Sequence, residues 1–279
     1  RTKFNTNPSN SSFLPACPIV EPLISKAKNA IPDDVDLQTV PIYLGATAGM
    51  RVLAPEKANL IFDSIRTTLR KSGFRFKDSW ANIISGEEEG AYGWIAANYL
   101  KQKLANGDDK TTYGALDLGG ASTQISFIPN ESILASKFQL QLSNKVHYQL
   151  YTHSYLYYGA NEAISRFNDL LIKAAGTKDN IQNPCYPKGY NKNGFNGTSD
   201  WNACFNKTLE LFNFQAPCYY EDQKPSRCSF NGVYQPPIQQ NIKFIGMSAF
   251  YYTWQFLKLK TGTDSDNLNT LRNVAETVC

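Results

Sequence analysis

The chain has 279 residues, of which 42% are apolar and 19% are charged, and its formal net charge is +4. This length suits one large or two medium-sized domains, each with a sizeable core. The positive charge is mild and scattered, so it does not indicate a nucleic-acid or polybasic membrane partner. No apolar run reaches the roughly 20 residues of a membrane-spanning helix. We expect the chain to be a piece of a longer protein and any membrane anchor to lie outside it.

The predicted elements alternate between helices and strands, as in α/β folds. In chain order we expect a helix at residues 21–30, a strand at 40–44, a helix at 54–71, a strand at 81–85 and a helix at 90–104. After these we expect a hairpin at 114–127 and helices at 161–173, 244–260 and 264–279. Glycine-bearing loops leave the ends of the strands, and open α/β sheets bind ligands at such ends.

The loop YLGATAGMR, at residues 43–51, joins a strand to a helix through small residues and ends at Arg51. It fits an oxyanion cradle with a guanidinium beside it. It fits a tight strand-to-helix connection as well, and it does not match the Walker pattern of phosphate-binding loops. The sequence leaves the role of Arg51 open.

The loop SGEEEGAYGW places three consecutive glutamates ahead of a helix that we expect to start near Gly90. Acids near a helix N-terminus are stabilised by its dipole, so a solvated helix start is one interpretation. The other is that one of these carboxylates is a general base, which takes a proton from an attacking water. Composition alone does not select the glutamate.

The hairpin GALDLGGASTQISF, at residues 114–127, carries one acid and several hydroxyls around a Gly-Gly turn. Because side chains alternate along a strand, Asp117, Ser122 and Gln124 are expected to line one cleft. The turn at 119–120 lacks side chains, so its backbone N–H groups can approach an oxyanion closely. A plain Gly-Gly turn with polar residues on its solvent side fits the same pattern.

Cysteines and glycosylation sequons indicate an oxidising compartment of the secretory pathway. Four of the six cysteines crowd a polar segment at about residues 182–237, where two local disulfides would stabilise a region with a weak core. The sequence contains no Cys/His spacing typical of a zinc site. The sequons begin at Asn10, Asn130, Asn196 and Asn206.

Taken together, YLGATAGMR, IISGEEEGAYGWIAANYL and GALDLGGASTQISF closely resemble three signature regions of the ecto-nucleoside triphosphate diphosphohydrolase (ecto-apyrase) family. They occur in the family's order and with similar spacing, and the resemblance extends from about Cys17 to the end of the chain. It implies an α/β, actin-like (ribonuclease H-like), two-lobed ATPase fold. Residues 1–84 would then be part of the N-terminal lobe and residues 85–279 most of the C-terminal lobe, with the cysteine-rich insertion at about 182–237.

The resemblance also implies hydrolysis of the terminal phosphates of nucleoside tri- and diphosphates, with Ca²⁺ or Mg²⁺ as cofactor. By match to the family's motifs, Glu89 corresponds to the general base and Asp117 to an acid that holds the hydrated metal. Ser122 and Gln124 correspond to groups that position the attacking water. Tyr252 is similar to an aromatic residue that stacks on the nucleobase. The phosphate-binding backbone positions correspond to Ala46, Thr47, Ala48, Gly49, Gly119, Gly120 and Ala121.

Two family signatures, D-x-G-S-S-x-T and W-x-L-G, do not occur in these 279 residues, and we expect them beyond the ends of the chain. The resemblance implies the disulfides Cys185–Cys204 and Cys218–Cys228. It implies that Cys17 pairs upstream and Cys279 downstream. The 279-residue chain alone is therefore expected to be inactive. The resemblance places the protein at the cell surface or in the secreted fraction, with the ER or Golgi lumen as the alternative.

A second class of function is a nucleotide-binding module of the same superfold that does not hydrolyse its ligand. The presence of Glu89, Asp117, Ser122 and Gln124 favours the enzyme. A third class comprises sugar kinases and exopolyphosphatases of the actin-like fold. These enzymes are mostly cytosolic, so the sequons and cysteines disfavour them.

Overall fold

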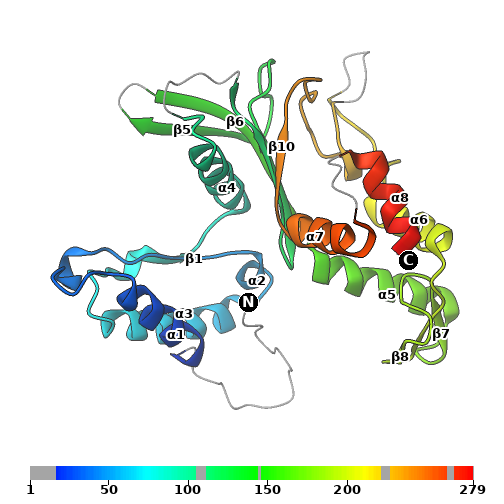
Figure 1. Cartoon of the computed structure of the whole chain (residues 1–279), viewed down its shortest axis with the longest axis horizontal. Coiled ribbons are helices and arrows are strands. Elements are labelled where there is room, and N and C mark those ends of the chain that lie inside the picture. Colours follow the sequence, from blue (N-terminus) through cyan, green and yellow to red (C-terminus); the bar gives the residue numbers. More distant parts are fainter. Residues whose placement is uncertain (1–16, 105–110, 144–145, 221–226, 263–266, 279) are drawn as a thin grey trace. The chain divides into compact units, whose positions relative to one another are not determined.

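The computed structural model describes residues 17–104, 111–143, 146–220, 227–262 and 267–278. Two of the residues singled out above, Asn10 and Cys279, lie outside these ranges. Contacts divide the chain into two compact units, Arg1–Ser85 and Gly86–Cys279. Figure 1 shows the elements of both units, and each unit is described by itself below.

The first unit packs helices against a small parallel sheet. Its helix α3 (Pro55–Arg70) starts with a proline at the first helical position, where the missing N–H would have no intrahelical acceptor. The buried positions of α3 recur at helical spacing and join one apolar core with Phe74 and Ala81. The other elements of this unit are α1 (Cys17–Asn29), β1 (Leu44–Ala46), α2 (Ala48–Arg51) and β2 (Ala81–Ile83).

The strand expected at residues 40–44 is shifted in the structure. Pro41 forms only an isolated bridge with Arg75, and the regular pairing of β1 with β2 starts at Leu44. Proline has no N–H to give to a ladder, which explains why the apolar run does not pair along its whole length.

The second unit is built on a five-stranded sheet with the strand order β10–β3–β4–β6–β5. β10 runs parallel to β3, and the other neighbouring pairs are antiparallel. The strands are β3 (Gly114–Leu118), β4 (Ser122–Phe127), β5 (Lys137–Ser143), β6 (Val146–Leu156) and β10 (Phe244–Ser248). The expected hairpin is thus present as β3 and β4.

Alternation gives the middle of this sheet two different faces. Phe127, Tyr151 and Tyr155 point to one face, where they form an aromatic cluster with Tyr234, which lies outside the strands of this sheet. Small polar side chains of β4 and β6 point to the other face, which we call the polar face. It consists of Ser122, Gln124, Ser126, Thr152 and Ser154.

Helix α4 (Gly86–Leu100) lies on the polar face, alongside β3, β4 and β6 (Figure 1). Two glycines allow this close approach. A Cβ atom at Gly86 would lie 2.2 Å from the Cβ of Ser154, and one at Gly90 would lie 2.4 Å from the Oγ1 of Thr152. The prediction that this helix starts near Gly90 is wrong, because the helix begins at Gly86 and the three glutamates form its first turn.

The helix expected at residues 244–260 is likewise only partly present. Its first residues form β10, and Ser248, with a φ of 57°, separates this strand from α7 (Ala249–Thr261). A short apolar run fits a buried strand and a buried helix equally well, so periodicity could not separate the two. The remaining helices of this unit are α5 (Ala160–Ala175), α6 (Trp201–Leu209) and α8 (Leu268–Val278).

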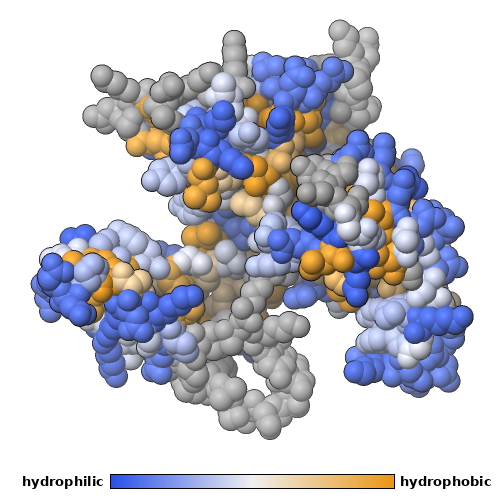
Figure 2. Space-filling model, viewed as in Figure 1, coloured by the Kyte–Doolittle hydropathy of each residue, from blue (hydrophilic) through white to orange (hydrophobic). Residues whose placement is uncertain are grey.

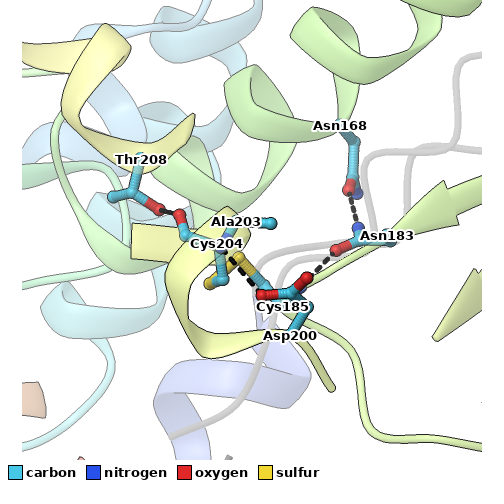
Figure 3. Close-up of a disulfide and its surroundings, with 7 residues drawn as sticks. All are labelled: Asn168, Asn183, Cys185, Asp200, Ala203, Cys204 and Thr208. Atoms are coloured by element: carbon cyan, nitrogen blue, oxygen red, sulfur yellow. Dashed lines mark hydrogen bonds between the residues drawn. A yellow bond between two sulfur atoms is a disulfide. The ribbon is translucent and has the colours of Figure 1, made fainter. Parts of the chain in front are cut away.

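The cysteine-rich segment contains both expected disulfides, Cys185–Cys204 and Cys218–Cys228. The first links the small sheet β7–β9–β8 to α6, and Figure 3 shows its surroundings. Asn183 is fully buried there, accepts a hydrogen bond from Cys185 N and donates one to the side chain of Asn168. The strands are β7 (Ile181–Asn183), β8 (Asn191–Lys192) and β9 (Phe195–Gly197).

Within the described ranges, no helix combines the length and hydropathy that crossing a lipid bilayer requires. Of the sequons that fall within these ranges, Asn130 and Asn206 are exposed and Asn196 is half-buried.

Candidate functional site

Three polar residues form one row across the polar face of the second unit. Asp117 of β3 lies opposite Gln124 of β4, which in turn lies opposite Ser154 of β6. Directly opposite residues of antiparallel strands have Cβ atoms about 5 Å apart. The register of the sheet therefore brings a carboxylate, an amide and a hydroxyl side by side.

Gln124 is the centre of this row and is only 1% exposed. Its Nε2 lies 2.5 Å from Ser122 Oγ, 2.8 Å from Ser154 Oγ and 3.4 Å from Glu89 Oε2. Its Oε1 is buried and has no hydrogen-bond partner among the described residues. If the amide were reversed, Oε1 would face the carboxylate of Glu89, so the observed orientation is the electrostatically favoured one.

Glu89 reaches this amide from the first turn of α4. Gly86 and Gly90 allow the helix to approach the sheet this closely, because a side chain at either position would collide with a strand. Glu89 immediately precedes Gly90, whose backbone packs against the polar face. The sequence left open which of the three glutamates faces the strands, and the structure brings Glu89 to Gln124.

Asp117 supplies a second buried acceptor. Its Oδ1 has no hydrogen-bond partner among the described residues. A buried carboxylate oxygen without a partner is costly, so it fits a site that a ligand or ion completes. No group of three or more His, Cys, Asp and Glu side chains that could hold a metal directly is found in the described ranges. A single carboxylate with an open oxygen fits a hard, hydrated cation held through water.

The turn between β3 and β4 is held by the first turn of α5. Gly119 O accepts a hydrogen bond from Ala160 N, and Gly120 O accepts from Asn161 N, both at 2.9 Å. These carbonyls thus satisfy N–H groups that have no acceptor inside the helix. In a trans peptide the N–H points away from the C=O. The N–H groups of Gly120 and Ala121 therefore point away from α5 and can face an anion.

The other predicted phosphate-binding positions belong to the first unit. Ala46 ends β1, Thr47 is the N-cap of α2, and Ala48 and Gly49 form its first turn. Arg51, whose role the sequence left open, donates from Nη1 to Ile84 O at 3.0 Å and so holds the end of β2.

Tyr252 is 61% exposed on α7, and its ring centroid lies 5.5 Å from that of Tyr251. Its side chain is therefore presented at the surface of the second unit, where a planar ligand could stack on it.

The two histidines lie on β6. His153 belongs to the side of the sheet that carries the aromatic cluster: its Nδ1 is 3.2 Å from Ser136 Oγ and its ring centroid is 4.6 Å from that of Tyr155. Burial lowers the pKa of His153 and raises the pKa of Tyr155. His147 is exposed. The imidazole of His153 therefore lies on the opposite face of the sheet from Gln124.

Sequence reasoning missed Ser154 and the contact made by Gly86. The signal for Ser154 was the alternation of small hydroxyl and aromatic residues in YTHSYL. That alternation points to Gln124 only once the register of β6 against β4 is known.

The fold and these residues define a mixed α/β protein with a candidate site at a glycine turn of the five-stranded sheet. The GDA1/CD39 (nucleoside phosphatase) family matches residues 3–279. Human ectonucleoside triphosphate diphosphohydrolase 3 is 38% identical over 90% of this chain and 53% of its own length. The human diphosphohydrolase 2 is 35% identical over 100% of this chain and 60% of its own length.

The chain belongs to the GDA1/CD39 family. A solved structure, described as nucleoside triphosphate hydrolases from Neospora caninum, superposes with a TM-score of 0.64 at 16% identity and covers 94% of this chain and 63% of its own. This likeness confirms the expected fold class, actin-like α/β. The chain spans about half the length of the first curated relatives that it matches, 53% and 51% for the human and mouse diphosphohydrolases 3.

Proposed function

We propose that the complete protein hydrolyses the terminal phosphates of nucleoside tri- and diphosphates. The observation that carries this proposal is the contact of the half-buried Glu89 with the buried pair Gln124 and Ser122, beside a glycine turn whose Gly120 and Ala121 N–H groups point away from α5. The names of the relatives support the same substrate class. Phosphoryl transfer to water requires mainly positioning and charge neutralisation. This group can supply the positioning.

In the proposed reaction a water oxygen attacks the terminal phosphorus. The carboxylate of Glu89 accepts one proton of this water. Oε1 of Gln124, which has no partner among the described residues, accepts a hydrogen bond from the other O–H of the water. Ser122, whose Oγ accepts from Gln124 Nε2, donates a hydrogen bond to the oxygen of the same water. The bond between phosphorus and the bridging oxygen breaks, and its electron pair stays on the leaving nucleotide phosphate. The products are inorganic phosphate and the shortened nucleotide.

Asp117 is the residue that we assign to a divalent cation, Ca²⁺ or Mg²⁺. Its open, buried Oδ1 fits a contact through one of the ion's waters. When bound, such an ion neutralises part of the negative charge of the phosphates. The residues Ala46–Gly49, Gly120 and Ala121 are assigned to phosphate oxygens through backbone N–H groups, and Tyr252 to the nucleobase. The N–H of Gly119, which the sequence also assigned to phosphate, donates to Ser122 O at 2.9 Å, so Gly119 closes the turn instead.

The relatives are named as ecto-enzymes. We propose on this basis that the protein faces the extracellular space, or a secretory lumen, as an anchored or secreted glycoprotein. The two disulfides fit an oxidising compartment. We further propose glycosylation at Asn10, Asn130, Asn196 and Asn206, and membrane anchoring only through segments outside these 279 residues.

The proposal is tested by replacing Glu89 with glutamine in the complete protein. Glu89→Gln keeps the shape of the side chain but removes the base. We expect at least a hundredfold loss of phosphate release from ATP, in line with a general-base contribution of about 10²–10⁴. Nucleotide binding, measured by calorimetry, should be retained.

Glu88→Gln is the matched control, because it removes the same charge from the same helix turn. Unchanged phosphate release by Glu89→Gln would refute the assignment of the base. Nucleotide binding without phosphate release by the unmodified protein would instead favour the non-hydrolysing module.

A further inference from the structure

The amide of Gln124 is fixed at its nitrogen end by two hydroxyls. Ser122 Oγ and Ser154 Oγ lie 2.5 Å and 2.8 Å from Nε2, and all three residues point to the polar face. A carboxamide has two N–H donors, so these two short contacts use both of them. The contact with Glu89 is longer, at 3.4 Å.

Fixing the nitrogen end also fixes the oxygen end, because the carboxamide is planar. Without Ser154, one N–H of Gln124 would lose its acceptor inside a fully buried environment. The amide would then rotate toward the carboxylate of Glu89, which is the acceptor next nearest to Nε2. This rotation would move Oε1 away from its present direction.

The neighbours of Ser154 limit the size of its side chain. Its side chain packs against Gly86, where even a methyl group on the glycine would lie 2.2 Å from the serine Cβ. The register pairs Ser154 directly with Gln124 across the β4–β6 ladder. A short hydroxyl side chain is therefore what fits between the helix and the amide.

We propose, on the basis of the function proposed above, that Ser154 is a positioning residue of the hydrolytic site. It holds the carboxamide of Gln124 so that Oε1 is presented to the attacking water and the amide nitrogen stays off the general base. Ser154 acts through Gln124 and does not itself contact the reacting atoms. Its loss should consequently lower the rate of the chemical step and leave substrate binding unchanged.

The test is a double-mutant cycle in the complete protein, with ATP as substrate and phosphate release as the readout. Ser154→Ala should lower kcat about tenfold with KM unchanged, since one buried hydrogen bond to the amide is lost. In a Gln124→Ala background, the same Ser154→Ala change should cause no further loss. Interacting residues give such non-additive effects, whereas independent effects multiply.

Ser126→Ala is the control for a merely structural role. Ser126 lies on the same face and its Oγ is 2.6 Å from Thr152 Oγ1, so the variant also removes a buried hydroxyl contact. It should lower thermal stability as Ser154→Ala does, with kcat kept within about twofold.

Two outcomes would overturn the inference in distinguishable ways. In the first outcome, Gln124→Ala lowers kcat strongly, but Ser154→Ala lowers it no more than Ser126→Ala does, or by the same factor with and without Gln124→Ala. The positioning role of Ser154 is then refuted and the proposed function stands. If Gln124→Ala leaves phosphate release unchanged, the proposed site fails and the role of Ser154 fails with it.

Discussion

Asn98 joins helix α4 to the strand that carries Asp117. It is fully buried, donates from Nδ2 to Trp94 O and Tyr113 O, and accepts at Oδ1 from Tyr113 N. Asn98→Ala would leave both backbone groups of Tyr113 without this partner. We expect a loss of about 2–3 kcal/mol in the free energy of unfolding, measured by urea denaturation, because unsatisfied buried polar groups are costly.

Asn202→Ala is the matched control for this prediction, since Asn202 is an exposed helical asparagine on α6. It should change the free energy of unfolding by no more than about 0.5 kcal/mol. Equal effects of the two variants would contradict the bridging role of Asn98.

His153 makes the stability of the protein dependent on pH. Burial lowers the pKa of its imidazole below the ordinary value of 6.5, so the unfolded chain binds a proton at a higher pH than the folded chain does. The contribution of His153 is therefore fully present above pH 6.5 and is lost as the pH falls toward the folded-state pKa.

The measurement for His153 compares the unmodified protein with His153→Gln across this range. The difference between their free energies of unfolding should shrink, or change sign, as the pH falls below 6.5. A difference that stays constant with pH would mean that the pKa of His153 is the same in the folded and the unfolded chain.

At the level of single residues, the sequence predicted which face the candidate residues share better than it predicted their contacts. Strand alternation is sufficient to place Asp117, Ser122 and Gln124 on one face. It is not sufficient to find Ser154, because that residue comes from a different hairpin and meets Gln124 only through the β4–β6 register. Pairing registers depend on long-range contacts that a local pattern does not encode.

At the scale of elements, α4 is docked on the sheet by its glycines. Gly86→Ala would place a methyl group 2.2 Å from the Cβ of Ser154, on a strand that cannot easily move. We expect α4 to be displaced, with a loss of about 1–3 kcal/mol in stability. Phosphate release should fall as well, because Glu89 is carried by the same helix turn. Thermal denaturation and steady-state kinetics measure the two effects.

Gly93→Ala tests whether the position of the glycine matters. A methyl group there would meet only Met247 Cε, at 3.0 Å, which is the end of a flexible side chain. Alanine is also favoured over glycine inside a helix by up to about 1 kcal/mol. This variant should therefore be as stable as the unmodified protein, or more stable, and equally active. Loss of activity in Gly93→Ala would show that α4 is sensitive to any added side chain.

The start of α4 shows why element boundaries were less predictable than element types. The glutamates favour a helix N-terminus through the dipole, which led to the expected start at Gly90. The helix instead begins at Gly86, where the lack of a side chain allows a tertiary contact with Ser154 that a local pattern does not reveal. The strand β10 was hidden for a related reason, since its pairing partner β3 lies more than a hundred residues away.

At the scale of the whole molecule, we expect the disulfide Cys185–Cys204 to stabilise the cysteine-rich insertion without contributing to the proposed site. Cys185 and Cys204 are 19 residues apart, so replacing both by alanine should cost about 3 kcal/mol through the entropy of the unfolded loop. The polar face is built from α4, β4 and β6, outside that loop. We expect lower thermal stability but retained phosphate release at moderate temperature. Loss of activity before unfolding would contradict this separation.

Helix α7 exposes several large apolar side chains. Figure 2 shows hydrophobic residues among hydrophilic ones on the part of the second unit that carries α7 and α8. On α7, Tyr251, Phe256 and Leu259 are 48%, 49% and 85% exposed. Large exposed apolar patches mark interaction surfaces or aggregation liabilities.

The purified 279-residue chain should accordingly bind a hydrophobic dye such as ANS and should release no phosphate from ATP. The family's D-x-G-S-S-x-T signature does not occur in it, and it spans about half the length of its relatives. A longer form of the length of the relatives, assayed in parallel, should bind less dye per molecule and should be active, if residues outside these 279 cover α7 and complete the proposed site. ATP hydrolysis by the 279-residue chain would show that the residues of the second unit, with those of the first, are sufficient for catalysis.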